Sequence, residues 1–352
     1  MATFGGLGGL GAAAPGQENA KDFELPGQLT DGISDLHWSP RADMLAAASW
    51  DNQVRIWDVN VQTSQAIPRT MFALDGPALS CRWTSDGSKV VAAGADKTAK
   101  LFDLQSNQAV QVAAHDAPIR FVRWFEENNN RVLITGSWDK TVKYWDLRSP
   151  TPVGTVNVGE RVYAMDAFGN LLVVGTADRK IHVINLSTPG NIFKTIESPL
   201  KWQLRTVACF PSGTGFALGS IEGRVGIQYI DDKNKADNFS FKCHRDSAQP
   251  PNVFAVNCIA VHPGYGTFAT CGSDGAFHFW DKDARTRLKM FTNAGKGVPI
   301  SAAAFSAQGN AFAYAVSYDW SKGHEHYQQG AANVIKIHAV QDADIKNRPK
   351  KR

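Results

Sequence analysis

Short apolar segments separated by turns run along most of the chain. The first set reads as three strands at 33–38, 44–49 and 54–59, with Asp51 in the turn before the third. Alternating or wholly apolar runs of this length, bounded by Gly, Pro, Asn or Asp, predict β-strands. The middle segment is almost wholly apolar, which indicates a strand that is buried on both faces.

This three-strand unit occurs seven times along the chain. Each copy carries an acid in the turn before its third strand: Asp51, Asp96, Asp139, Asp178, Glu222, Asp274 and Asp319. Because 268 residues separate the first acid from the last, the six intervals average about 45 residues, at the edge of the WD-repeat range. Four copies end the third strand in an aromatic residue and Asp: Trp57-Asp58, Phe102-Asp103, Trp145-Asp146 and Trp280-Asp281. Such repeats bury their apolar faces only by stacking, so the sequence predicts an all-β fold, a seven-bladed WD40 β-propeller.

The repeats divide the chain into a propeller at 21–340 and two short tails that we expect to be flexible. Residues 22–25 alternate polar and apolar side chains, and we expect them to form the outer strand of the last blade and close the ring. Residues 1–20 are rich in Gly and Ala; a GxGxxG match at 6–11 lacks the strand and helix that a dinucleotide site needs. Residues 341–352 form a basic C-terminal tail, for which a solvated terminus and a nuclear-import or nucleic-acid patch both remain open.

Composition and motifs limit the classes of function that this chain could have. The formal net charge is only +4, so a nucleic-acid site would have to be local. Five cysteines without a CxxC pair favour reduced thiols in an intracellular protein, and no apolar run predicts a membrane span. The sequence contains no nucleophile elbow, P-loop or paired catalytic carboxylates, and the histidines at 324 and 326 lack a third ligand of clear spacing. We therefore expect no catalysis, no cofactor and no metal.

Two histidines precede blades that carry a complete Asp and Trp pattern. We expect a buried chain of hydrogen bonds in each, with structural residues His115, Asp139 and Trp145 in one blade and His244, Asp274 and Trp280 in the other. A fully satisfied buried network of this kind makes a blade rigid. The structural interpretation is favoured over a catalytic one.

The turns that carry the repeated acids and the links between blades share one side of a propeller, here called the top face. Two long loops, at 244–255 and 321–333, belong to it, and long loops on a rigid scaffold usually carry binding residues. We predict that an acidic, extended peptide binds there through Trp50, Trp138, Lys201, Arg205, Arg224, Lys242, Arg245 and Trp320. The alternatives are indoles half-buried under loops and a solvated charge cluster partly neutralised by Glu197 and Glu222.

A separate basic strip follows the third strand of blade six. Its members are Lys282, Arg285, Arg287 and Lys289. Cations spaced along a turn and an outer strand could contact phosphates, which makes the strip a nucleic-acid candidate. Asp281 and Asp283 lie beside it, so a solvated turn is at least as good an interpretation.

Several longer strings resemble the nuclear-pore mRNA-export WD-repeat family. They are ESPLK at 197–201, GFALGSIEGRV at 215–225, NFSFKCHR at 238–245, FWDKDART at 279–286 and SYDWSKGHE at 317–325. The resemblance covers the whole ring and is more specific than a generic WD repeat. It implies a seven-bladed adaptor that docks an acidic hairpin, the GLEBS motif, of an FG-nucleoporin. In that match Arg224 and Lys242 would contact carboxylates, with Trp50 and Trp138 lining the groove.

The resemblance also implies where the protein acts and which partners it has. We expect a monomeric propeller within a heteromeric complex at the nuclear pore, with possible exchange to the cytoplasm and links to RNA or ribonucleoprotein. A sister family of mitotic-checkpoint WD-repeat proteins binds the same motif class on checkpoint kinases, and spindle proteins are further candidate partners. Two other classes remain as alternatives: a direct RNA-binding protein and a propeller enzyme with a metal in its channel.

Overall fold

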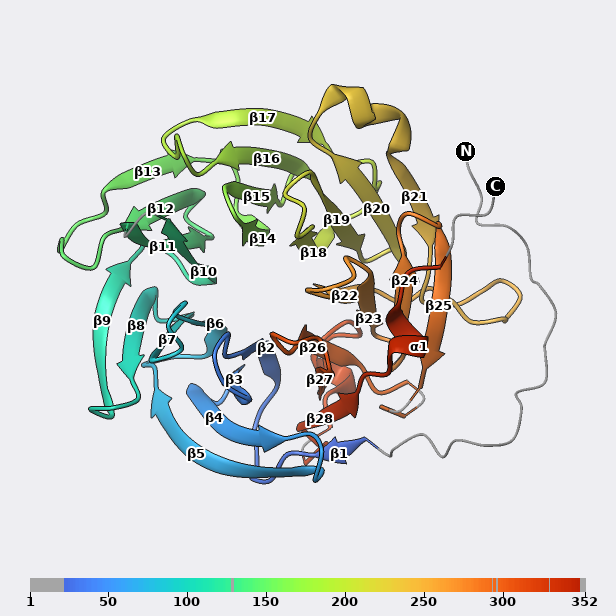
Figure 1. Cartoon of the computed structure of the whole chain (residues 1–352), viewed down its shortest axis with the longest axis horizontal. Coiled ribbons are helices and arrows are strands. Elements are labelled where there is room, and N and C mark those ends of the chain that lie inside the picture. Colours follow the sequence, from blue (N-terminus) through green and yellow to red (C-terminus); the bar gives the residue numbers. More distant parts are fainter. Residues whose placement is uncertain (1–21, 128–129, 293, 296, 329, 349–352) are drawn as a thin grey trace.

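Seven four-stranded antiparallel sheets form a closed ring in the part of the chain that the computed structural model describes. The described residues are 22–127, 130–292, 294–295, 297–328 and 330–348. Figure 1 shows the sheets arranged radially, with one strand of each sheet around the centre and one at the rim. The predicted seven-bladed WD40 propeller is therefore confirmed.

The strands follow the same order in the first six blades. The innermost strands are β2 (Ile33–Trp38), β6 (Ala78–Trp83), β10 (Ile119–Glu127), β14 (Val162–Phe168), β18 (Leu204–Cys209), β22 (Val256–Val261) and, in blade seven, β26 (Ile300–Phe305). The second strands are β3 (Met44–Ser49), β7 (Lys89–Gly94), β11 (Asn130–Ser137), β15 (Leu171–Thr176), β19 (Gly215–Ser220), β23 (Phe268–Gly272) and β27 (Ala311–Val316). The third strands are β4 (Gln53–Asn60), β8 (Thr98–Asp103), β12 (Thr141–Trp145), β16 (Lys180–Asn185), β20 (Arg224–Tyr229), β24 (Phe277–Asp281) and β28 (Val334–Ala339). The outer strands are β5 (Gln65–Ala73), β9 (Gln108–Ala114), β13 (Gly154–Asn157), β17 (Ile192–Glu197), β21 (Phe239–Lys242), β25 (Thr286–Phe291) and, in blade seven, β1 (Phe23–Glu24).

Burial follows strand position within a blade. Every residue of β15 and of β27 is buried, as expected for a strand covered by blades on both sides. The outer strands expose large apolar side chains, including Ile67 and Phe193, each at 67%. The apolar clusters lie between neighbouring blades; one of them joins Leu36 and Ala47 of blade one to Ala313 and Ile337 of blade seven. Each blade is thus stabilised by its neighbours.

The two ends of the ring meet in blade seven. Strand β1 pairs with β28 in antiparallel register, Phe23 opposite Ile337, which confirms the predicted closing strand. Asp22 adds side-chain contacts: the Tyr314 hydroxyl donates to one carboxylate oxygen at 2.6 Å and His338 Nδ1 lies 2.7 Å from the other. The closure covers an edge of β28 that would otherwise carry unpaired backbone groups.

Short helical turns lie outside the sheets. Two are 3₁₀ turns, η1 (Asp232–Asp237) and η2 (His324–His326), and the third is α1 (Asp342–Ile345). Helix α1 lies beside β25 in Figure 1, and Ile345 is fully buried. The Arg348 backbone N–H donates to Asp281 at 3.0 Å. The C-terminal segment was expected to be a flexible, basic tail, but residues 342–348 are packed on blade six because Ile345 and Asp344 find buried partners there. Residues 1–20 of the N-terminal tail lie outside the described residues.

Candidate functional site: the top face

A cavity of about 560 Å³ opens at the centre of the top face. Four of the eight predicted peptide-binding residues line it: Trp50, Trp138, Arg205 and Trp320. Trp50 and Trp138 occupy the turns before the third strands of blades one and three, while Trp320 follows the second strand of blade seven. The turn chemistry of three different blades therefore brings three indoles to one opening.

The indoles are unequally exposed. Trp50 and Trp320 have 41% and 44% of their surface accessible, so both indoles are open to a ligand. Trp320 stacks on Tyr327 with 5.3 Å between ring centroids and 5° between planes, and Tyr318 lies 5.5 Å from it. The blade-seven insertion thus supplies a small aromatic platform at the edge of the cavity.

Trp138 is less exposed than the other two indoles. It is half-buried, and its indole nitrogen is buried without a hydrogen-bond partner among the described residues. A buried donor without an acceptor costs about 1–3 kcal/mol, so this group would gain from an acceptor that a ligand brings.

Sequence reasoning missed other aromatic residues of this face. Tyr163 and Tyr318 line the cavity, and Trp202, next to the lining residue Gln203, is 60% exposed in the link into blade five. A large aromatic residue in a polar link was the available signal for Trp202. Nothing in the local pattern marks Tyr163, because its position at the mouth depends on the closed ring.

The other four predicted residues gather around Glu222, in the turn before β20. The Lys201 backbone N–H donates to its carboxylate at 3.0 Å, Arg224 Nε lies 3.5 Å from the other carboxylate oxygen, and Arg245 donates to its backbone carbonyl at 2.7 Å. Lys242 is exposed and lies opposite Arg224 in the β20–β21 register. Of these contacts only that of Arg224 joins a cationic group to the Glu222 carboxylate.

The basic strip on blade six is largely paired. Lys282 forms an ion pair with Asp283 at 2.9 Å and also lies over the Phe210 ring, and Lys289 forms one with Asp344 at 2.6 Å. Arg285 covers the Phe239 ring at 4.6 Å. A weaker contact joins Arg287 to the Met290 sulfur at 3.9 Å. The strip belongs to the β24–β25 turn and to the outer strand β25, which lies at the rim of the ring in Figure 1, and none of its residues lines the top-face cavity.

The expected hydrogen-bond chains are present in blades three and six. In blade six Trp280 Nε1–H donates to Thr270 Oγ1 at 2.9 Å, and the same hydroxyl lies 2.9 Å from His244 Nε2. His244 Nδ1 lies 2.9 Å from Asp274. The simplest assignment places the ring proton on Nδ1, donating to the carboxylate, and lets the threonine hydroxyl donate to Nε2.

Blade three repeats this arrangement. His115 lies 2.7 Å from both Asp139 and Thr135, and Trp145 donates to Thr135 at 2.9 Å. Burial lowers the pKa of His115 even though Asp139 opposes the shift, so the imidazole is neutral and can accept from the threonine hydroxyl.

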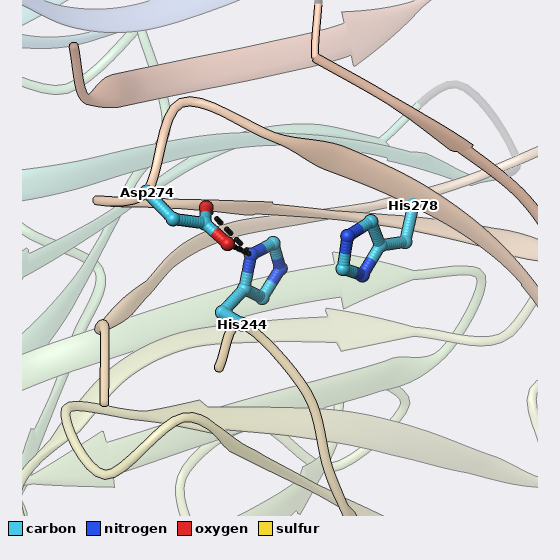
Figure 2. Close-up of side chains that lie close together, drawn as sticks. All are labelled: His244, Asp274 and His278. Atoms are coloured by element: carbon cyan, nitrogen blue, oxygen red, sulfur yellow. Dashed lines mark hydrogen bonds and ion pairs between the residues drawn. The ribbon is translucent and has the colours of Figure 1, made fainter. Parts of the chain in front are cut away.

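Only one group of side chains with metal-binding chemistry occurs in the described part of the chain: His244, Asp274 and His278 (Figure 2). The two imidazole rings stack in parallel, with centroids 4.5 Å apart and 2° between planes. Histidine binds metals through a lone pair in the ring plane, so parallel stacked rings do not converge on one ion. Both nitrogens of His244 are moreover engaged by Asp274 and Thr270. His244 and Asp274 thus belong to a buried polar network, and the stacked rings do not have the geometry of a metal centre.

No helix in the described residues has the length and apolar character needed to cross a membrane. The five cysteines are free thiols.

Comparison with known proteins identifies the family. The family model "WD domain, G-beta repeat" matches residues 21–58, 70–103, 107–146 and 239–281. Each match ends at one of the four copies with an aromatic residue and Asp. The chain is 53% identical over 333 residues to the "Poly(A)+ RNA export protein" of Schizosaccharomyces pombe, covering 94% of each chain. It is 52% identical over 337 residues to "mRNA export factor GLE2" of Chaetomium thermophilum, covering 93% of each.

A less similar relative matches over nearly the same length of the chain. The chain is 45% identical over 330 residues to "Protein Rae1" of Drosophila melanogaster, covering 91% of this chain and 94% of that protein. The relatives match more than nine-tenths of this chain, whereas the family model leaves residues 147–238 and 282–352 unmatched. This chain belongs to the mRNA-export family of WD-repeat propellers.

Proposed function

We propose that this protein is a non-enzymatic adaptor of the nuclear pore that supports mRNA export. It docks an acidic hairpin of the GLEBS type, carried by an FG-nucleoporin, on its top face. The observation that carries the proposal is the aromatic mouth beside a cationic patch: Trp50, Trp138 and Trp320 line one cavity, and the cations around Glu222 lie in links and turns of the same face.

The chemistry of the two groups is complementary to such a peptide. Indoles at a concave mouth are strong anchors for apolar side chains, and Trp50 and Trp320 are exposed there. Arg224 is half-buried beside Glu222, so its guanidinium is partly desolvated and its planar fork suits a carboxylate. Lys242, opposite it in the sheet, adds a second cation.

The relatives support the cellular setting. They are named export proteins for poly(A)+ RNA and mRNA, and they match 94% and 93% of this chain. We propose that the protein acts in the nucleus, at the nuclear envelope within the pore complex, as a monomeric propeller in a heteromeric assembly. Checkpoint kinases that carry the same motif class, and spindle proteins, are the competing partners. Recovery of such kinases from cell extract without any FG-nucleoporin would contradict the proposal.

Direct RNA binding through the blade-six strip receives less support from the geometry. Ion pairs to Asp283 and Asp344 reduce the charge that Lys282 and Lys289 could offer to phosphates. A steep loss of RNA affinity with rising salt, removed by substitution of Arg285 and Arg287, would restore this alternative.

The direct test is calorimetric titration of Arg224→Glu with an acidic hairpin peptide. Like-charge repulsion and an unpaired peptide carboxylate should weaken binding by about 2–5 kcal/mol, while the melting curve stays that of the wild type. Arg69→Glu is a matched control, because Arg69 lies on β5 at the rim with 49% of its side chain exposed. Equal affinity of Arg224→Glu and wild type would remove Arg224 from the site.

A further inference from the structure

Each innermost strand carries a β-bulge near its start. The register to the second strand skips one residue in every blade, and the skipped residues are Ser34, Leu79, Arg120, Tyr163, Arg205, Asn257 and Ser301. All seven line the top-face cavity, so they form a ring, here called the bulge ring, at the mouth of the central channel. Bulges re-aim side chains and often lie next to binding sites.

The bulge ring carries two positive charges and no acid. Its two serine hydroxyls donate to backbone carbonyls and the Asn257 amide donates to Asp319, so its free donor capacity lies mainly in the two guanidiniums. Arg120 uses one N–H for the carbonyl of Leu79 at 2.8 Å, and Arg205 uses one for the side-chain oxygen of Asn257 at 3.2 Å. A guanidinium has five N–H donors, so most of these remain for a ligand. Among the described residues, no carboxylate lies within salt-bridge distance of either arginine.

The acids deeper in the channel already form ion pairs with other arginines. Asp35 pairs with Arg82 at 2.9 Å, and Asp166 pairs with Arg123 at 2.8 Å. At the mouth, Asp319 accepts hydrogen bonds from Asn257 and Ser273. Arg120 and Arg205 thus lie in a partly enclosed space without a carboxylate partner among the described residues.

Burial and the neighbouring guanidiniums make this an unfavourable position for a cation. Burial, with a smaller contribution from Arg205, Arg123 and Arg82, lowers the pKa of Arg120 to about 10, although Asp35 opposes the shift. Buried charges are costly unless an opposite charge compensates them. A bound anion would supply that compensation.

We propose that the bulge ring binds a small phosphate-bearing anion, held by the remaining N–H groups of Arg120 and Arg205. A cavity of about 360 Å³ continues below the ring, and Arg120 and Arg205 line both spaces. The anion site lies at the channel axis, whereas the cations around Glu222 lie on blade five and its links. The anion site shares the top-face cavity and Arg205 with the predicted peptide-binding set, but its test uses no peptide.

The test is isothermal titration of the full chain with inorganic pyrophosphate at physiological salt. Arg205→Gln and Arg120→Gln should each weaken binding at least about tenfold, since each removes charge-assisted hydrogen bonds to the anion. Arg69→Gln, at the rim, is the charge-matched control and should change affinity less than about twofold. A melting curve for each variant separates lost binding from lost folding, and Arg205→Gln leaves the bond from Arg120 to Leu79 in place.

Three results would overturn the proposal. The first is no binding of pyrophosphate by the wild type, and the second is wild-type affinity in a folded Arg205→Gln. The third is an equal loss in Arg69→Gln, which would indicate diffuse electrostatic attraction. Glutarate serves as a dicarboxylate arm: binding as tight as that of pyrophosphate would show that the ring does not select phosphates over carboxylates, and this result would also contradict the proposal. No peptide is present, so failure here leaves the docking proposal untouched.

Discussion

Thr270→Val tests the hydrogen-bond chain of blade six. Thr270 is fully buried, and its hydroxyl links the Trp280 indole to His244 at 2.9 Å on each side. Valine has nearly the same volume, so the substitution opens no cavity. It removes one acceptor and one donor, and it leaves the indole N–H and the imidazole Nε2 buried without partners.

The expected cost follows from these two orphaned groups. Each buried unsatisfied polar atom costs about 1–3 kcal/mol, so the variant should lose about 2–6 kcal/mol of unfolding free energy. With an unfolding entropy of about 2.1 cal/mol/K per residue, a chain of 352 residues has about 0.7 kcal/mol/K. The melting temperature should therefore fall by about 3–8 °C.

Calorimetry gives the melting temperature, and amide and indole hydrogen exchange gives the local effect. We expect faster exchange of the Trp280 indole proton in Thr270→Val. Thr70→Val is the control, because the Thr70 hydroxyl lies on the outer strand β5 and donates to Asn107 where water can replace it. A loss below about 1 kcal/mol, with unchanged protection of the indole, would refute the assigned role of the chain.

Two further outcomes are expected. Trp138→Ala should weaken acidic-hairpin binding by about 2 kcal/mol or more in calorimetry, and a loss under half of that would mark the indole as scaffold. His278 is buried, and burial, followed by His244 and Arg287, lowers its pKa well below the usual value. The unfolded chain then binds more protons below about pH 6.5, so stability should fall as the pH drops, by up to about 1.4 kcal/mol per pH unit from this group. Denaturant titrations should show a shallower pH dependence in His278→Asn, and parallel curves would contradict the assignment.

The local pattern of apolar and turn residues was sufficient to predict where the strands of the first blade begin and end. The first blade begins with strands at Ile33–Trp38 and Met44–Ser49, the same bounds that the apolar runs predicted. Blades five and seven lack the aromatic-Asp ending, yet the turn acids Glu222 and Asp319 still located them, because the turn needs a side chain that accepts backbone hydrogen bonds. The packing of α1 was not predicted, since a single buried Ile345 leaves no periodic signal in a basic segment.

The sequence by itself determined the number of blades, the strand order, the closing strand and the face on which the long loops lie, because turn residues and apolar periodicity act over a few residues. Only the tertiary structure decided which side chains meet. Trp50, Trp138 and Trp320 share one cavity although 270 residues separate the first from the last, and Arg120 and Arg205 come from blades three and five. Such neighbours depend on the closure of the whole ring, which brings the start of every innermost strand to the same central mouth.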